Sequence, residues 1–166
     1  MATSTITINE KFTNKFLDGR ILKKFTNIIP KGINIYLLEI NKISILYLSK
    51  TKNGFKNGNY IGYIQFFFSI ENTTVMYLDV NKKYRGNRIS LFLFLLMSEY
   101  ICFMGGNLIE LDDDSDNAWD LDNNLYVKLG MIYINPKPYP EMIGYTCDIK
   151  NRWDKNKFTF KTFFNN

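Results

Sequence analysis

The 166-residue sequence contains no histidine, only two cysteines and only four prolines. Without histidine the chain cannot use Ser-His or Cys-His catalysis, histidine-based general acid–base chemistry or the ligand sets of nearly all zinc enzymes, so we expect no metal cofactor. Cys102 and Cys147 form no C-x-x-C pair. We therefore expect two buried thiols in a reducing intracellular compartment, the cytoplasm.

Long hydrophobic runs are also missing. The most apolar stretch, residues 89–104, is interrupted by Ser90, Ser98 and Glu99. Because a membrane-spanning helix needs about 20 apolar residues, this stretch predicts a buried helix, and no membrane is expected as a partner. Residues 1–9 lack the charged and apolar regions of a signal peptide.

The composition is that of a folded protein from an A/T-rich genome. Hydrophobic residues make up 46% and charged residues 22% of the chain, so residues 1–166 are predicted to form a single globular domain. Asn, Ile, Lys, Phe and Tyr, which all have A/T-rich codons, supply nearly half of the residues. The net charge of +5 is uneven, because residues 1–60 are basic and residues 101–149 are acidic. This asymmetry suggests an anionic ligand on one side and a cationic ligand on the other.

The spacing of apolar residues predicts a mixed α/β or α+β sheet with helices on its faces. Apolar positions three and four apart predict a helix, or a broken pair of helices, over residues 12–29. A further helix is expected over residues 117–129, and Gly105 should end the helix 89–104. The expected strands are residues 3–8, 33–40, 43–49, 60–70, 75–80, 108–111, 131–134 and 143–149.

The stretch that joins the strand 75–80 to the helix 89–104 carries the first chemical signal. Asn87 is a favourable N-cap for that helix. The unpaired N–H groups of a helix N-terminus, together with its dipole, bind anions such as a pyrophosphate. Arg85 and Arg88 flank this point. Taken alone, the two arginines fit a solvated helix start as well as they fit an anion-binding site.

Two motifs in this order resemble the GNAT N-acetyltransferase superfamily. Tyr84-Arg85-Gly86-Asn87-Arg88-Ile89-Ser90 resembles the acyl-coenzyme A loop of that family, [RQ]-x-x-G-x-[GA] after a β-strand. Leu125-Tyr126-Val127-Lys128-Leu129-Gly130-Met131 resembles its Leu-Tyr-x-x-Leu-Gly-Phe signature, with Met131 in place of Phe. The resemblance implies a GNAT-like acyl-CoA acyltransferase fold, with a central, mostly antiparallel sheet splayed between two strands and flanked by helices. Small GNAT-like proteins of A/T-rich genomes, such as large DNA viruses, are similar, and a viral origin would place the protein in the host cytoplasm or the virion.

The same resemblance implies an acyl-CoA-dependent N-acetyltransferase. Such an enzyme transfers an acetyl group directly from acetyl-CoA to a primary amine of a small molecule or protein. Tyr126 would be the general acid that protonates the leaving thiolate, and Asp79 and Asp112, at the ends of two strands, are the candidate general bases. The residues that would hold the coenzyme lie on the strand and the loop after it, namely Leu78 to Val80 by their backbone, Arg85, Gly86, Asn87, Arg88, Ile89 and Ser90.

The sequence departs from the family pattern at two positions. Arg88 stands where the loop pattern has its central glycine, and Ser90 stands where it has its last small residue. If residue 88 has right-handed helical geometry, its guanidinium can point outward and add to the binding of phosphates. If its Cβ points into the pocket, coenzyme binding is weakened or lost.

Other interpretations of these features stay open. Tyr126 fits a core aromatic residue as well as an acid, and Asp79 fits a solvated strand position. The acidic run of residues 112–116 lacks the ligand spacing of an EF-hand, so it would cap the next helix or attract a cationic amine.

Two other classes of protein compete with the enzyme. One is a GNAT-fold binding or structural module, for example a homodimer, with weakened or lost catalysis. The other is suggested by residues 150–161, which mix basic and aromatic side chains as nucleic-acid binders do. Because codon bias makes a solvated terminal strand the simpler explanation, nucleic acid is not expected as a partner.

Overall fold

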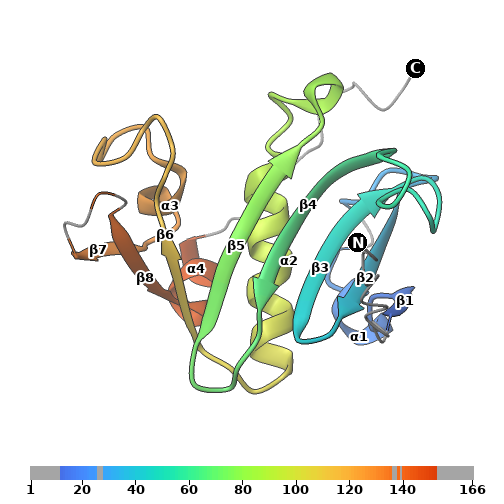
Figure 1. Ribbon diagram of the computed structural model, residues 1–166, viewed down its shortest axis with the longest axis horizontal. Helices are drawn as coiled ribbons and strands as arrows, with labels where there is room; N and C mark the ends of the chain where they lie inside the picture. Colours follow the sequence, from blue (N-terminus) through green and yellow to red (C-terminus); the bar gives the residue numbers. More distant parts are fainter. Residues whose placement is uncertain (1–11, 26–27, 136–137, 139, 153–166) are drawn as a thin grey trace, which may run out of the picture.

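The computed structural model describes residues 12–25, 28–135, 138 and 140–152. Its strands form one eight-stranded sheet in the order β1-β2-β3-β4-β5-β6-β8-β7, as Figure 1 shows. The strands are β1 (Phe12–Phe16), β2 (Asn34–Ile40), β3 (Ile43–Ser49), β4 (Tyr60–Phe67), β5 (Thr73–Val80), β6 (Leu108–Asp112), β7 (Ile132–Asn135) and β8 (Glu141–Tyr145). Neighbouring strands pair antiparallel except β5 and β6, which are parallel. The mixed, mostly antiparallel sheet expected from the sequence is confirmed.

The strands β2 to β5 form the meander that the apolar pattern predicts. Each strand pairs with the next along the chain, and the connections are residues 41–42, 50–59 and 68–72. The side chains of β2 and β3 are buried on both faces of the sheet. One face contributes to the main core, and the other carries a separate cluster centred on Tyr36, Leu38, Ile45 and Tyr47.

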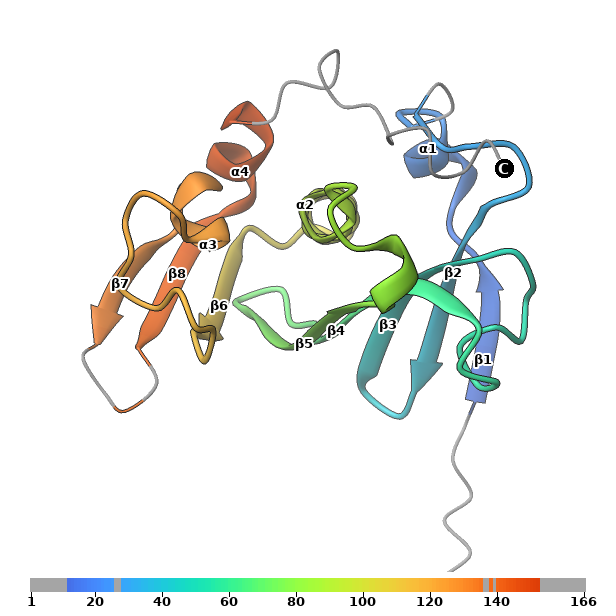
Figure 2. The same cartoon turned by 90° about the horizontal axis from the view of Figure 1, so that it is seen from above.

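The helix α2 (Ile89–Phe103) lies across the middle of the sheet, and Figure 2 shows α1 and α4 on the same side of the sheet as α2. Residues 92–101 of α2 are all buried, because the sheet covers one side of the helix and neighbouring helices cover others. A helix that is apolar all round is expected in such a position. Gly105 follows the helix with a φ of 88°, which only glycine adopts without strain. The predicted helix and its glycine stop are confirmed.

The predicted helix over residues 12–29 is wrong in its first half. Residues 12–16 form β1, which pairs with β2 from Phe12↔Ile40 to Phe16↔Tyr36. The helix α1 (Gly19–Leu22) has only four residues and begins after Asp18, whose carboxylate accepts a hydrogen bond from the N–H of Arg20. The periodic spacing holds only in the second half, where Leu17, Ile21 and Phe25 are buried. The edge of β2 offers backbone hydrogen bonds to residues 12–16, and sheet pairing overrides the helical pattern there.

Two elements near the C-terminus also differ from expectation. The helix predicted over residues 117–129 is reduced to α3 (Leu125–Lys128), because turns occupy most of the preceding segment. The strand predicted over residues 143–149 ends at Tyr145, and α4 (Thr146–Arg152) follows at once. Thr146 ends the strand because its N–H and hydroxyl both donate to Asn107, before β6. The strand predicted over residues 3–8 and most of the basic-aromatic tract 150–161 lie outside the described residues.

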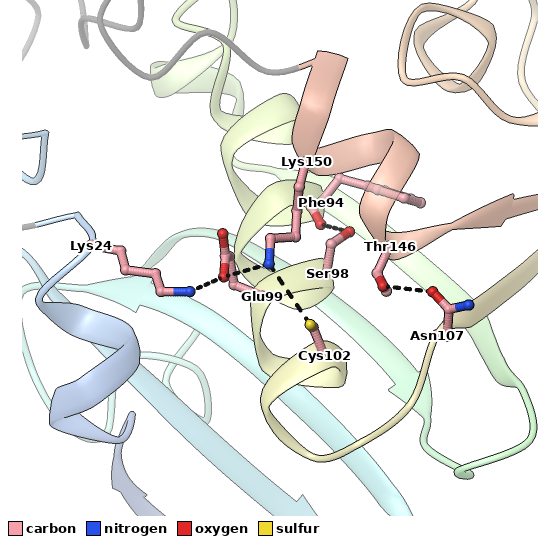
Figure 3. Close-up of polar contacts among 8 residues, drawn as sticks. All are labelled: Lys24, Phe94, Ser98, Glu99, Cys102, Asn107, Thr146 and Lys150. Atoms are coloured by element: carbon pink, nitrogen blue, oxygen red, sulfur yellow. Dashed lines mark hydrogen bonds and ion pairs between the residues drawn. The ribbon is translucent and has the colours of Figure 1, made fainter.

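A buried carboxylate of α2 pairs with one lysine from α4 and one from the turn that follows α1. Glu99 of α2 is 2% exposed and lies 2.5 Å from the ammonium of Lys24 and 3.4 Å from that of Lys150 on α4, as Figure 3 shows. The Lys150 ammonium also lies 3.7 Å from the thiol of Cys102. Both cysteines are free and exposed, so the prediction of buried thiols is wrong. They sit on the solvent side of α2 and α4, where thiols need no packing partner.

The sheet opens between β5 and β6. These strands pair only at Thr73↔Ile109 and Thr74↔Glu110, and Figure 1 shows them diverging from that point. A register shift in the β4–β5 pairing leaves Met76 as an extra residue between Val75 and Tyr77. Such a β-bulge bends its strand, so β5 turns away from β6 where the pairing stops. In the described part of the chain, no helix is long and apolar enough to cross a membrane.

Candidate active site

The first hollow of the site lies between the diverging strands, and we call it the strand cleft. Its volume is about 570 Å³. Its walls come from β5, β6, the residues after β6, and β8, namely Thr74, Val75, Met76, Tyr77, Glu110, Leu111, Asp112, Asp114 and Glu141. Four of these side chains are carboxylates and none is basic, so the cleft attracts cations. Among the described residues, no group of three Cys, Asp or Glu side chains is arranged to hold a metal ion.

The second hollow, the loop cleft, continues along β5 to the start of α2. Its volume is about 440 Å³, and it is lined by Leu78, Asp79, Val80, Tyr84, Arg85, Gly86, Arg88, Ile89 and Ser90. A short 3-10 helix (Lys82–Tyr84) and Gly86, with a φ of 82°, turn the chain from β5 into α2. Each of the clefts is therefore walled by one half of β5, and residues 74–80 span about 20 Å at roughly 3.3 Å per residue.

The start of α2 differs from the expected cap. The N-cap residue is Arg88 and not Asn87, and it makes no side-chain capping bond. The amide of Asn87 is buried and instead donates to the carbonyl oxygens of Tyr84, at 2.9 Å, and Arg85, at 3.4 Å. This inward turn of Asn87 stabilises the loop and leaves the first N–H groups of α2 free of side-chain caps. Those groups can bind an anion from outside the protein.

Arg88 adopts a backbone conformation that favours glycine. Its φ of 60° and ψ of 24° lie in the left-handed region, so the right-handed geometry considered for this residue is wrong. The family pattern has glycine here, and the backbone of this chain has the shape that glycine would take. Arg88 is exposed and lines the loop cleft, directly before the free N–H groups of α2.

Arg85 and Asp79 are tied to one another and to the end of β5. The Nε of Arg85 donates to the carbonyl of Val80 at 3.0 Å, and its guanidinium lies 3.6 Å from an Asp79 oxygen. The other Asp79 oxygen accepts a hydrogen bond of 2.9 Å from the Tyr60 hydroxyl. Burial, followed by this bond, raises the pKa of Tyr60. Asp79 thus has a side-chain partner at each of its two oxygens.

Tyr126 lies in the single turn of α3, outside the residues that line the two clefts. Its ring packs against that of Phe94 of α2, with the centroids 5.7 Å apart. Burial and, to a smaller extent, the carboxylates of Asp113 and Asp114 raise the pKa of Tyr126 to about 12. With its pKa raised in this way, Tyr126 is protonated at neutral pH.

The sequence matches no protein-family model and no curated protein. Solved structures do share its fold. The PaiA N-acetyltransferase of Thermoplasma acidophilum, in complex with coenzyme A, has a TM-score of 0.50 and 17% identity, over 63% of this chain and 61% of that one. An aminoglycoside 6'-acetyltransferase of type Ii has a TM-score of 0.50 and 17% identity, over 64% of this chain and 70% of that one. A Klebsiella pneumoniae protein described as an acyl-CoA N-acyltransferase has a TM-score of 0.51 and 11% identity, over 83% of this chain and 98% of that one.

The chain has the GNAT acyltransferase fold. At these identities the likeness concerns the fold, and the match covers less than two thirds of the T. acidophilum protein. The splayed pair β5 and β6 and the loop that leads into α2, which the resemblance implied, are both present in this chain. Activity and substrates have to be argued from the residues themselves.

The structure brings most of the predicted site residues to two neighbouring places. Leu78, Asp79, Val80, Arg85, Gly86, Arg88, Ile89 and Ser90 line the loop cleft, and Asp112 lines the strand cleft. Asn87 is beside the loop cleft but faces inward.

Sequence reasoning missed the remaining walls of the strand cleft. Met76, Tyr77, Glu110 and Glu141 come from three strands, β5, β6 and β8, that are distant in sequence. The excess of acidic residues over 101–149 was the only available signal. It indicated the charge of the cleft but not which carboxylates line it.

Proposed function

We propose that this protein is an acyl-CoA-dependent N-acetyltransferase that uses acetyl-CoA and acetylates a primary amine. The observation that carries the proposal is the continuity of the site along β5. A helix start with uncapped N–H groups lies at one end of the strand, and an acidic cleft lies at the other. Between them, the edge of β5 that faces β6 pairs with no described residue after Thr74. An extended donor with phosphates at one end and an acyl group at the other fits this shape.

The loop cleft supports the coenzyme part of the proposal. A pyrophosphate would accept hydrogen bonds from the free N–H groups of residues 88–91, where the α2 dipole also favours negative charge. Arg88 would add a charge-assisted bond, while Lys82 and Lys83, both exposed, add positive charge to the same turn. The unpaired edge of β5 from Val75 onward would hydrogen-bond the pantetheine arm. The Val80 carbonyl is already used by Arg85, so that arm would rely on the residues before it.

The strand cleft supports an amine acceptor. A substrate amine is protonated in water at neutral pH, and Asp112, Asp114 and Glu141 give its ammonium a favourable potential. Glu110 is less available, because the Thr74 hydroxyl donates to it at 2.8 Å. Met76 and Tyr77, 43% and 60% exposed, provide apolar surface for the carbon chain of the acceptor.

The chemical step follows from these assignments. Asp112, directly or through a water molecule, removes a proton from the ammonium, and the amine lone pair attacks the thioester carbonyl carbon. The C–N bond forms, the C–S bond breaks, and the electron pair of that bond leaves on sulfur. Tyr126 protonates this thiolate, and the second proton lost from nitrogen returns the tyrosine to its neutral form. We assign the base to Asp112 rather than to Asp79, whose oxygens already bind Tyr60 and Arg85.

A non-catalytic GNAT-fold binding module is the second candidate. The observation that favours it is the pair of arginines in the loop cleft, Arg85 and Arg88, which occupy space beside the helix start. In that case the fold would persist while the coenzyme is excluded.

Calorimetric titration with acetyl-CoA separates the two candidates. The enzyme predicts heat of binding at micromolar concentrations, and the absence of heat at high micromolar concentration would refute it. A panel of amines, including spermidine, lysine peptides and aminoglycosides, is then incubated with acetyl-CoA and analysed by mass spectrometry for a gain of one acetyl group. Tyr126→Phe should slow transfer at unchanged acetyl-CoA affinity, and equal rates would remove Tyr126 from the acid role.

A further inference from the structure

A buried side-chain pair connects the end of β6 to the start of α3. Asp113, directly after β6, and Asn124, directly before α3, are each 1% exposed. The amide Nδ2 of Asn124 donates to Oδ2 of Asp113 at 2.7 Å. The pair closes the loop between them, in which the sequence pattern predicted a helix.

Asn124 is held from several directions. Its Oδ1 accepts hydrogen bonds from the backbone N–H groups of Tyr126, at 2.9 Å, and Val127, at 3.1 Å. Besides Asp113, its Nδ2 donates to the Asn117 carbonyl at 3.0 Å and to the Tyr133 hydroxyl at 3.3 Å. The amide therefore has one orientation, with its oxygen toward α3 and its nitrogen toward Asp113.

Asp113 is itself fixed. Its Oδ2 also accepts a bond of 2.9 Å from the Tyr133 hydroxyl, and its Oδ1 accepts from the N–H of Ser115, at 3.1 Å, and its hydroxyl, at 2.6 Å. The Asp113 N–H donates to the Pro140 carbonyl at 2.8 Å. A buried carboxylate with this many donors is a rigid anchor.

The helix that carries Tyr126 depends on this anchor. Four residues are too few to form a stable helix by themselves, so the first turn of α3 is defined by the Asn124 cap. The backbone N–H of Tyr126 is one of the two groups that the cap binds. A shift of Asn124 would therefore shift Tyr126.

We propose that Asp113 is a positioning residue for Tyr126, which it holds in place through the side chain of Asn124. This inference rests on the proposed function only for the acid role of Tyr126. The Asp113 carboxylate also contributes, after burial, to the raised pKa of Tyr126, so the residue that places the hydroxyl also helps to keep it protonated.

Three variants test the pair. Asp113→Asn removes an acceptor that faces the Asn124 amide, and Asn124→Asp brings two carboxylates together. The exchange Asp113→Asn with Asn124→Asp reverses the direction of the hydrogen bond and restores it, because the amide then at position 113 can donate to the carboxylate then at position 124. Aspartate is as good an N-cap as asparagine, so the exchanged pair still binds the N–H groups of Tyr126 and Val127.

The first measurement is NMR of the unliganded protein with 13Cζ-labelled tyrosine, in which Tyr126→Phe assigns the Tyr126 signal. We expect each single variant to move this signal. We expect Asp113→Asn, which removes a carboxylate that raises the pKa of Tyr126, also to lower the pH at which the signal titrates. We expect the exchange to return the signal toward the wild-type position. A signal that stays in place in both folded single variants would overturn the proposal. If a single variant does not fold, Ser115→Ala, which removes one donor to Asp113 without touching α3, should also move the signal.

The second measurement is steady-state kinetics with acetyl-CoA and spermidine. Asp113→Asn should lower kcat about tenfold, a part of the roughly 10²–10⁴-fold that a general acid contributes, with the KM for acetyl-CoA unchanged. In the Tyr126→Phe background the same substitution should lower kcat no further. Multiplied effects would mean that Asp113 does not act through Tyr126, and would overturn the proposal. Absence of turnover with every amine would instead refute the proposed function, and the NMR result would still decide whether Asp113 places Tyr126.

Discussion

Replacing Arg88 with glycine should stabilise the protein and weaken its binding of acetyl-CoA. Arg88 has a φ of 60° at the start of α2, and its side chain lines the loop cleft. The backbone therefore favours glycine while the proposed ligand favours arginine. The two effects have opposite signs and can be measured separately.

The gain in stability follows from the backbone. A left-handed residue with a Cβ costs about 1–2 kcal/mol, and glycine regains this at a cost of roughly 0.5–1 kcal/mol in chain entropy. The Arg88 side chain makes no capping bond that would be lost. The free energy of unfolding should therefore rise by about 0.5–1 kcal/mol, and Tm by about 1–4 °C in a chain of this size.

The loss of affinity follows from the charge. A hydrogen bond between a guanidinium and a phosphate contributes about 1.5–3 kcal/mol, so Arg88→Gly should raise the Kd for acetyl-CoA by about 10–100-fold. Thermal denaturation measures the first effect, and calorimetric titration at constant salt measures the second.

Asn41→Gly is the matched control for this experiment. Asn41 also has a positive φ, 56°, in the turn between β2 and β3, away from both clefts. Its replacement should raise Tm slightly and leave the Kd unchanged. Tighter binding of acetyl-CoA by Arg88→Gly would show that the side chain obstructs the cleft. A lower Tm would refute the argument from backbone strain.

Three further predictions concern the support of the site. Gly62→Ala should destabilise the protein by about 1–3 kcal/mol and lower its affinity for acetyl-CoA, because the new Cβ would lie 3.0 Å from Ile89 at the start of α2. The control is Gly19→Ala, which has open space around it and should change neither the urea midpoint nor the Kd. Glu99→Gln should lower the free energy of unfolding by about 1–2 kcal/mol, since it removes the carboxylate between Lys24 and Lys150, and a urea midpoint equal to that of the wild type would contradict this. The pKa of Tyr126 is raised to about 12, above that of the unfolded chain, so its contribution to the free energy of unfolding should be complete below pH 10 and should be lost toward pH 12. The free energy of unfolding should therefore fall less steeply with pH in Tyr126→Phe. For the same reason kcat should show no alkaline loss below pH 10.

The sequence predicts those parts of the fold in which local pattern and tertiary packing agree. Residues 89–104 are apolar all round and are followed by two glycines, so the pattern gives both the burial and the end of α2. The meander from β2 to β5 is predicted for the same reason, because each apolar run is short and is bounded by turn residues. In these segments no competing partner offers the backbone a better set of hydrogen bonds.

Prediction failed where a distant partner decides the conformation. Residues 12–16 have helical spacing, but the open edge of β2 pairs with them. The segment before Leu125 has helical spacing too, yet Asn124 donates a hydrogen bond to Asp113 and is the N-cap of a shorter helix. Neither partner can be recognised from a single sequence, since each contact joins residues far apart along the chain.

The same distinction applies to the site. The loop cleft is built mainly from one continuous stretch, residues 78–90, so its motif could be recognised in the sequence. The strand cleft takes its walls from three strands and lies where β5, which carries a bulge at Met76, leaves β6. A bulge of this kind has no residue signature, and its place had to come from the structure.

The opening between β5 and β6 has an energetic cost, because strand edges that could pair with one another remain unpaired. The helix α2 makes this arrangement stable. It buries residues 92–101 against the sheet and its neighbouring helices, and at roughly 1.5–3 kcal/mol for each fully buried large apolar side chain this packing exceeds the loss of a few sheet hydrogen bonds at about 1 kcal/mol each. The helix that fills the concave side of the sheet is thus also the helix whose N-terminus forms the loop cleft. Packing and anion binding depend on the same element, so a substitution that displaces α2, such as Gly62→Ala, should reduce stability and coenzyme affinity together.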